Sequence, residues 1–151
     1  MLFGRITLVD VARAKQEVRT IPSREIIKEK RVSIGKGKYL VDLIATITMD
    51  GLIVSIVGGE TPHVGAVALS IPRTSLKNSS KLSATTSVLT LVGHKDDEVA
   101  RSAAERLAKE FNQTVVVIAG VHIEEAKEED IEKLTHNSMH AVEVFLRNFK
   151  K

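Results

Sequence analysis

The chain lacks cysteine and tryptophan, and its 151 residues include only one tyrosine and three prolines. The lack of cysteine excludes disulfides, thiolate catalysis and cysteine-ligated zinc, so any metal must be bound by histidine, carboxylate or water. Aromatic residues make up only 3% of the chain, which leaves few rings for unstacked bases to lie on. Binding to single-stranded nucleic acid is therefore disfavoured.

Long apolar runs and long runs of one charge are also missing. No segment approaches the roughly 20 apolar residues of a membrane-spanning helix, and Arg5 and Asp10 leave too short an apolar stretch for a signal peptide. The 22 basic and 19 acidic residues are mixed along the chain, with a net charge of +3. There is no basic stripe of the kind that binds nucleic-acid backbones. We expect a cytoplasmic protein that binds neither nucleic acid nor membrane.

The apolar pattern predicts one α/β domain over residues 1–151. Apolar residues alternate from Val41 to Met49, and Asp50-Gly51 then supplies a turn into 52–57, which predicts a β-hairpin. The remaining expected elements are strands over 64–71, 87–92 and 114–121 and helices over 96–111 and 127–149. The strands at 87–92 and 114–121 flank a helix, so they form a βαβ unit with parallel strands. The fold class is a single-domain mixed sheet with a β-hairpin, one βαβ unit and a C-terminal helix.

Three segments carry weaker signals. A short strand is expected near Arg5 to Val9, and the rest of residues 1–30 stays unassigned. The polar and basic stretch from Pro72 to Ser83 predicts a surface loop, either a lid over a ligand or a solvated connection.

In the last helix an apolar stripe lies at helical spacing, whereas His136 and His140 fall nearly opposite it. No glutamate follows His136 to complete the zinc-protease pattern, so the pair is interpreted as a polar helix face. The residues expected in the stripe are Ile131, Leu134, Val142, Phe145 and Phe149.

The other three histidines, His63, His94 and His122, lie in glycine-flanked turns at strand ends. Parallel strands in the βαβ unit make His94 and His122 leave the sheet at the same edge. If the strand after His63 runs antiparallel to the next one, its start meets that same edge. The sequence therefore predicts that three imidazoles converge.

Several uses of this edge are open. Each histidine could cap a strand end through a backbone hydrogen bond. Alternatively, the three could bind zinc, iron or manganese, with Glu60, Asp96 and Glu124 as further ligands or as partners that orient the imidazoles. A further alternative is an anion site formed by Gly58-Gly59 and the start of the helix. The acids of residues 96–98 would repel a phosphate there, and Lys95 is the only cation in the motif.

The chain carries three motifs in a fixed order: Gly-Gly-Glu-Thr-Pro-His-Val-Gly-Ala-Val-Ala-Leu from residue 58, Val-Gly-His-Lys-Asp-Asp from 92 and Ala-Gly-Val-His-Ile-Glu from 119. These resemble the motifs of the LpdD-like prenylated-flavin chaperone family, typified by the small D subunit of gallate and hydroxybenzoate decarboxylase systems. The likeness covers residues 38–135.

The resemblance implies a fold related to proteasome assembly chaperones. It also implies a non-catalytic protein that binds prenylated FMN and supports the maturation of a UbiD-type decarboxylase, with a flavin prenyltransferase as a further partner. Related folds assemble in pairs, which suggests a homodimer in which Arg73 reaches the neighbouring protomer's site.

Carried over by motif, the residues that hold a divalent metal or the ligand are His63, His94 and His122, and the cofactor-binding residues are Gly58, Gly59, Glu60, Gly65, Lys95 and Asp96. Glu124 stands where the family pattern has aspartate. Two other functions stay open. One is a small metal-dependent hydrolase that uses the same histidines, with Glu60 or Asp96 as general base to a metal-bound water. The other is an assembly chaperone without a small ligand.

Overall fold

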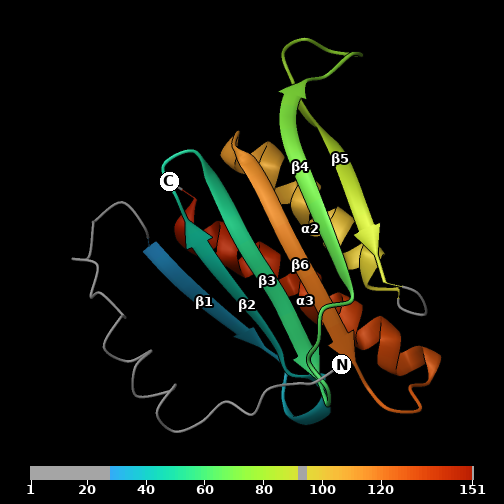
Figure 1. Cartoon of the computed structure of the whole chain (residues 1–151). Coiled ribbons are helices and arrows are strands. Elements are labelled where there is room, and N and C mark those ends of the chain that lie inside the picture. Colours follow the sequence, from blue (N-terminus) through green and yellow to red (C-terminus); the bar gives the residue numbers. More distant parts are fainter. Residues whose placement is uncertain (1–27, 92–94, 151) are drawn as a thin grey trace, which may run out of the picture.

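The computed structural model describes residues 28–91 and 95–150 as one six-stranded mixed sheet with two helices on one face (Figure 1). The strand order is β1-β2-β3-β6-β4-β5. The elements are β1 (Lys28–Ile34), a 3-10 turn η1 (Gly37–Tyr39), β2 (Val41–Ile47), β3 (Gly51–Gly59), β4 (Ala66–Thr74), β5 (Leu82–Thr90), α2 (Asp96–Phe111), β6 (Thr114–His122) and α3 (Glu128–Phe149). The expected α/β class is confirmed, whereas the strand expected near Arg5 to Val9 lies outside the described residues.

The core lies between the sheet and the helices because every second strand residue is apolar. Leu43, Val54 and Val117 point to the helix side and are fully buried. They meet Leu107 of α2 and Phe145 of α3, which are also fully buried. Each such side chain contributes about 1.5–3 kcal/mol through its removal from water.

The β2–β3 hairpin and helix α2 form where the sequence predicts them. Ile47 pairs with Leu52 across the hairpin, and Met49, which the alternation placed in the strand, instead lies exposed in the turn. Helix α2 covers residues 96–111, as expected, and ends at Asn112, whose φ of 52° gives a left-handed cap.

Helix α3 buries most of the expected stripe, and Phe149 packs half-buried against the core. Leu134, Val142 and Phe145 are buried, but Ile131 is 42% exposed, so its assignment to the core is wrong. Ile131 lies in the first turn of α3, where the helix stands away from the sheet edge and leaves a pocket beneath it.

Strands β5 and β6 are parallel, as expected, but β4 lies between them and runs antiparallel to both. Ala66 at the start of β4 therefore pairs with Thr90 at the end of β5 and with Ala119 near the end of β6. The expected meeting of these strand ends at one edge is confirmed.

The stretch from Pro72 to Ser83 is not a loop throughout, so that prediction is wrong at both ends. Pro72–Thr74 complete β4 and Leu82–Ser83 begin β5, which leaves residues 75–81 as the turn. The β4–β6 pairing ends at Ser70. The outer part of the β4–β5 hairpin consequently projects beyond the sheet with solvent on both sides (Figure 1), and its strands can be polar on both faces. The hairpin tip lies at the opposite end of β4 from His63, so it is not a lid over that histidine in its own chain.

A polar clamp joins η1 to the start of α3. The Asp130 carboxylate accepts hydrogen bonds from the Tyr39 hydroxyl at 2.6 Å and from the Lys127 backbone N–H at 3.0 Å, and the Lys38 ammonium lies 2.9 Å away. These contacts lower the pKa of Asp130, with the Tyr39 hydrogen bond as the largest cause and the Lys38 contact second. The clamp fixes the α3 N-terminus, which forms one wall of the pocket described below.

We predict that Asp130→Asn lowers the melting temperature by several degrees at pH 7, and that this difference shrinks in acid. Because the pKa in the folded state is depressed, the stabilisation is present above the unfolded pKa of about 3.9 and is lost as the pH falls through the folded value. Melting curves of both proteins between pH 7 and pH 2.5 test this. A difference that stays constant over that range would contradict it.

Candidate functional site

Four segments meet at the edge of the sheet where β3 and β6 end. Gly59 of β3 pairs with His122 of β6, and the 60–65 connection then crosses to the start of β4. Helix α2 begins at the same edge with Asp96. Motifs far apart in the sequence therefore supply adjacent groups.

Backbone hydrogen bonds hold the 60–65 connection in place. The His122 carbonyl accepts hydrogen bonds from the N–H groups of Glu60 at 2.7 Å and Thr61 at 3.3 Å. At the other end, the Gly65 N–H donates to the Ala119 carbonyl at 2.8 Å. The turn that carries His63 is thus fastened to β6 on both sides.

His63 and Asp96 form the centre of the site. The His63 Nδ1 donates to the Thr61 carbonyl at 3.1 Å, and its Nε2 lies 3.3 Å from Oδ2 of Asp96. Oδ1 of Asp96 accepts a hydrogen bond from the Val121 backbone N–H at 3.0 Å. The Asp96 side chain is only 5% exposed, so one buried carboxylate links the His63 turn, β6 and the start of α2.

His122 lies next to His63, and two glutamates border the pair. The two imidazole rings are 5.8 Å apart in an edge-to-face arrangement. Oε2 of Glu124 lies 3.5 Å from the His122 Nε2. Oε2 of Glu60 accepts a hydrogen bond from the Glu124 backbone N–H at 3.1 Å. Glu60 therefore ties the first motif to the third.

The glycines of the motifs allow protein segments to approach one another. A Cβ on Gly59, whose φ is 81°, would lie 2.0 Å from the His122 carbonyl oxygen, and a Cβ on Gly65 would lie 1.9 Å from Oδ2 of Asp96. A Cβ on Gly58 would lie 2.3 Å from the Leu40 carbonyl oxygen. A Cβ on Gly120, the glycine of the third motif, would lie 1.8 Å from the His63 carbonyl oxygen. Protein atoms already occupy these Cβ positions, so any larger residue would displace the turn or the segment packed against it.

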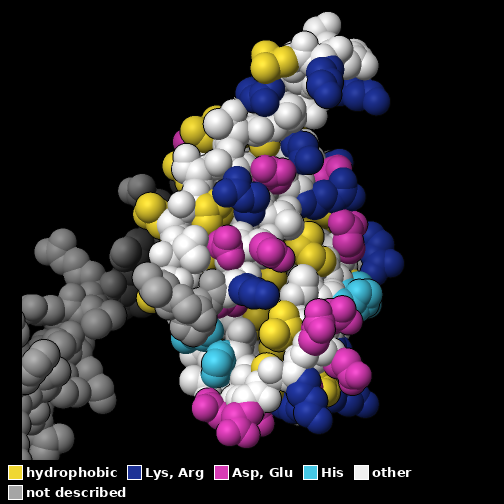
Figure 2. Space-filling model, turned by 90° about the vertical axis from the view of Figure 1, so that its right-hand side faces the viewer, with side chains coloured by type: hydrophobic (Ala, Val, Ile, Leu, Met, Phe, Trp, Pro, Cys, Tyr) yellow, Lys and Arg dark blue, Asp and Glu magenta, His cyan; other side chains and the backbone are white. Residues whose placement is uncertain are grey.

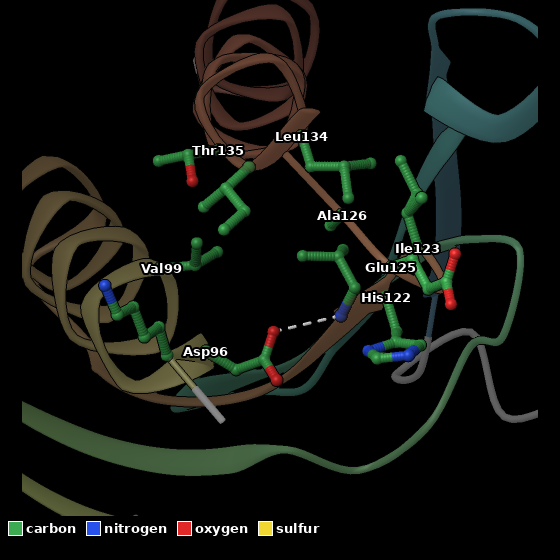
Figure 3. A pocket seen from close by; sticks show the side chains of 11 residues that line it. Asp96, Val99, His122, Ile123, Glu125, Ala126, Leu134 and Thr135 are labelled. Atoms are coloured by element: carbon green, nitrogen blue, oxygen red, sulfur yellow. Dashed lines mark hydrogen bonds between the residues drawn. The ribbon is translucent and has the colours of Figure 1, made fainter. Parts of the chain in front are cut away.

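A pocket of about 310 Å³ opens beside Asp96 and His122, between α2, α3 and the end of β6 (Figure 3). Asp96 and His122 lie along one side of it, and Lys95 and Glu125 contribute further charge. The opposite walls are mostly apolar and comprise Val99, Val121, Ile123, Ala126, Ile131, Leu134 and the methyl-bearing Thr135. Ligand pockets have this character, with apolar walls and a few polar groups that set orientation.

The model of the prenylated flavin chaperone LpdD-like domain matches residues 35–150 of this chain. The chain belongs to this family. The match confirms the resemblance carried by the three motifs and extends it almost to the C-terminus. No curated protein matches the sequence.

Among solved structures, one similar to the LpdD-like chain comes from a chaperone complex for yeast 20S proteasome assembly. The TM-score is 0.53 at 18% sequence identity, and the alignment covers 83% of this chain and 96% of the other. This likeness shows the fold, and it confirms the expected relation to proteasome assembly chaperones at that level.

The structure brings together most of the predicted site residues of the LpdD-like chain. His63, His122 and Asp96 lie in the central cluster, and Lys95 reaches the pocket. His94 lies outside the described residues. Within residues 28–91 and 95–150, no three histidine, aspartate or glutamate side chains converge closely enough to hold a metal ion.

Two other predicted features lie away from this edge. His136 and His140 are exposed on α3, as the sequence predicts. Arg73 is near the far end of β4. Most of the apolar pocket walls could not be predicted because they come from separate elements, and the helical apolar stripe indicated only Ile131 and Leu134. No helix in the described part of the chain has the length and apolarity needed to cross a membrane.

Proposed function

We propose that this LpdD-like chain binds prenylated FMN at the sheet edge and delivers it to a UbiD-type decarboxylase. The observation that carries the proposal is the apolar pocket directly beside the His63–Asp96–His122 cluster, in a member of a family of prenylated flavin chaperones. Prenylated FMN combines an apolar ring system with a charged phosphate, so it needs adjacent sites of both kinds.

The pocket suits the ring end of this ligand. Its volume of about 310 Å³ is at the lower end of the range for ligand pockets, about 300–1,000 Å³. That is room for part of a flavin nucleotide. Val99, Ile123 and Leu134 offer apolar contact, and the exposed Ile131 can close over a bound ring. The phosphate then lies toward the histidines.

A divalent cation between the phosphate and Asp96 explains how two negative groups share one site. His63 Nε2 and Asp96 Oδ2 are 3.3 Å apart, which is within the spacing of about 3.0–3.4 Å expected for neighbouring nitrogen and oxygen ligands of one ion. His63 and Asp96 would hold the ion. The motifs suggest His94 and His122 as further ligands, and His122 would have to move toward the ion, since no third such side chain of the described residues converges on the pair. The ion would supply positive charge for the phosphate.

The chain's own groups have binding roles in this proposal. Asp96 accepts the Val121 N–H and Glu60 accepts the Glu124 N–H, so backbone hydrogen bonds fix the orientation of both carboxylates. The reactive chemistry belongs to the flavin once it is in the decarboxylase. We infer a non-catalytic carrier that shields the cofactor.

Anaerobic reconstitution tests the function. Apo-decarboxylase is mixed with prenylated FMN with and without the LpdD-like protein, and decarboxylase activity is measured before and after brief exposure to air. We expect the protein to raise the active fraction, with an effect that saturates at a stoichiometric amount. Equal activity in every arm would overturn the proposal, and metal-dependent hydrolysis of esters or phosphates by the isolated protein would favour the hydrolase.

A pocket-filling variant links this activity to the structure. Thr135→Trp places an indole in the pocket and should weaken flavin binding at least about 10-fold, because the ring can no longer enter. His140→Ala changes the exposed side of the same helix and is the matched control. Flavin fluorescence or absorbance titration measures both variants. If Thr135→Trp binds like the native chain, the ring lies elsewhere.

A further inference from the structure

The two outer strands of the described sheet, β1 and β5, are protected against further pairing to different degrees. β1 begins with four charged residues, 28–31, and charged side chains on an outer strand discourage pairing with another chain. The nine residues of β5 include neither a charged residue nor a proline. Within the described residues β5 has β4 on one side and no strand on the other (Figure 1). Its outer edge is therefore open to pairing.

Hydrogen bonds at both ends of the β4–β5 ladder show which backbone groups of β5 face this edge. The Ser75 N–H donates to the Lys81 carbonyl at 2.8 Å. The Leu91 N–H donates to the Gly65 carbonyl at 2.9 Å, so the bonded pairs lie at odd-numbered residues. In an antiparallel ladder, bonded and non-bonded pairs alternate. The N–H and C=O groups that point away from β4 are consequently those of residues 82, 84, 86, 88 and 90.

The other free edge of the projecting hairpin is blocked by a proline. The pairing of β4 with β6 ends at Ser70, so the outer part of β4 has no described strand on that side. Pro72 pairs with Ala84, and as an even-numbered residue it directs its backbone nitrogen away from β5. That nitrogen carries no hydrogen, which prevents regular pairing with a further strand. Among these outer edges only that of β5 lacks a charge or a proline.

Charge on this side of the molecule is uneven, as Figure 2 shows, with basic side chains on the projecting hairpin and both signs below it. Residues 61–95 contain no acid. Helix α2, which packs behind β5, carries both signs, with Glu98 and Arg101 exposed, and Lys95 is exposed at the site end. A partner's acidic residues are therefore favoured at the hairpin end only. The basic residues of the hairpin are Arg73, Lys77 and Lys81.

Strand β5 leads from the hairpin to the candidate site. Thr90 at its end pairs with Ala66, and the next residue, Leu91, bonds to Gly65 at the end of the turn that carries His63. A strand laid along β5 therefore ends beside this turn. A protein that takes a ligand from the site needs a contact at this place.

We propose that the decarboxylase that receives the flavin adds an extended segment to the sheet as a seventh strand along β5. Its backbone pairs with the even-numbered residues of β5, and its acidic side chains lie against the hairpin. On the open face its apolar side chains pack on Leu89, which is 77% exposed. In strand addition, main-chain hydrogen bonds supply affinity and side-chain contacts supply specificity. The identity of the partner rests on the proposed function, whereas the open edge does not.

Amide hydrogen exchange of the native chain tests the pairing residue by residue. In the free protein we expect fast exchange at Ala84, Thr86 and Val88 and slow exchange at Thr85 and Ser87, which bond to β4. Apo-decarboxylase should slow the three fast amides at least about 10-fold. Slow exchange of these amides in the free protein would show that residues 1–27 or a second copy already covers the edge. That result, or unchanged exchange with apo-decarboxylase present, would overturn the proposal.

A proline on the outer edge tests the same contact by affinity. Ala84→Pro removes an outward N–H and leaves the β4–β5 ladder intact, so affinity for apo-decarboxylase should fall at least about 10-fold while flavin affinity stays native. Ala84→Ser keeps the N–H and is the matched control. Native decarboxylase affinity in folded Ala84→Pro would overturn the proposal, and the exchange experiment decides where this variant does not fold. A native chain that binds no flavin would count against the proposed function instead.

Reversal of charge tests the acidic part of the partner. Lys77→Glu combined with Lys81→Glu should slow association with apo-decarboxylase about 10-fold at low salt, because opposite charges steer the encounter. Lys28→Glu combined with Lys36→Glu makes the same change in net charge away from β5 and should have a smaller effect. Equal association rates for the two double variants would overturn the acidic contact at the hairpin.

Discussion

Asp96→Asn is expected to weaken prenylated FMN binding by about 10- to 150-fold while the protein melts within a few degrees of the native chain. The asparagine oxygen can still accept the Val121 N–H, so the buried backbone donor keeps its partner. In the proposed function Asp96 holds the cation that faces the flavin phosphate, so the lost charge weakens that contact with the ligand, and contacts with charged groups contribute about 1.5–3 kcal/mol. Anaerobic flavin titration and melting curves are the measurements.

Two further variants separate the binding role of Asp96 from its structural one. Asp97→Asn removes the same charge from the same turn of α2 and should bind flavin like the native chain. Asp96→Ala removes the charge and also leaves the Val121 N–H without its acceptor, which adds a stability cost of about 1–3 kcal/mol. If Asp96→Asn binds as tightly as Asp97→Asn, the buried carboxylate is a structural link and the ligand lies elsewhere.

Local signals explain why much of the fold could be predicted from the sequence. The Asp50-Gly51 turn between two alternating segments fixed the β2–β3 hairpin, and three acids at the start of α2 with Asn112 at its end fixed that helix. The meeting of strand ends followed from chain topology, because a helix between two strands makes them parallel. These features depend on residues close together in the sequence or on a general rule of chain connection.

The errors occur where tertiary surroundings decide the structure. The projecting hairpin has solvent on both sides, so its strands lack the apolar alternation that identifies a half-buried strand, and residues 72–74 and 82–83 resembled a loop. Ile131 continues the apolar stripe of α3 but lies beyond the sheet edge. Periodicity reveals which face of a helix is apolar, and it does not reveal where the sheet beneath that face ends.

Only part of the candidate site could be predicted, because the remaining part depends on tertiary surroundings. The motifs identified His63, His122 and Asp96 as neighbours, but the pairing of His63 with Asp96 and of Asp96 with the Val121 N–H depends on side-chain positions across three elements. The clamp of Tyr39 and Asp130 joins residues 91 positions apart and leaves no pattern in the sequence. The pocket walls also combine residues from separate elements, so no pattern in the sequence reveals them.

Gly120→Ala is expected to abolish flavin binding and to lower the melting temperature by about 2–12 °C. The new Cβ would lie 1.8 Å from the His63 carbonyl oxygen and 2.5 Å from its carbonyl carbon. These are backbone atoms, so no change of rotamer relieves the clash and the turn that carries His63 must move. Overpacking of this kind costs about 1–3 kcal/mol, and a protein of this length loses about 2–4 °C per kcal/mol. Moving the turn separates His63 from Asp96 and removes one side of the binding cluster.

Gly37→Ala provides the comparison that makes this prediction specific. Gly37 has a positive φ of 56°, unlike Gly120, and a Cβ there would meet no atom within 4 Å. Alanine at this position therefore costs only the left-handed backbone strain, about 1–2 kcal/mol, and should leave flavin affinity unchanged. The decisive quantity is affinity at a temperature where both variants are folded. If Gly120→Ala is folded there and binds flavin like Gly37→Ala, the His63 turn can move without loss, and it is no part of the binding site.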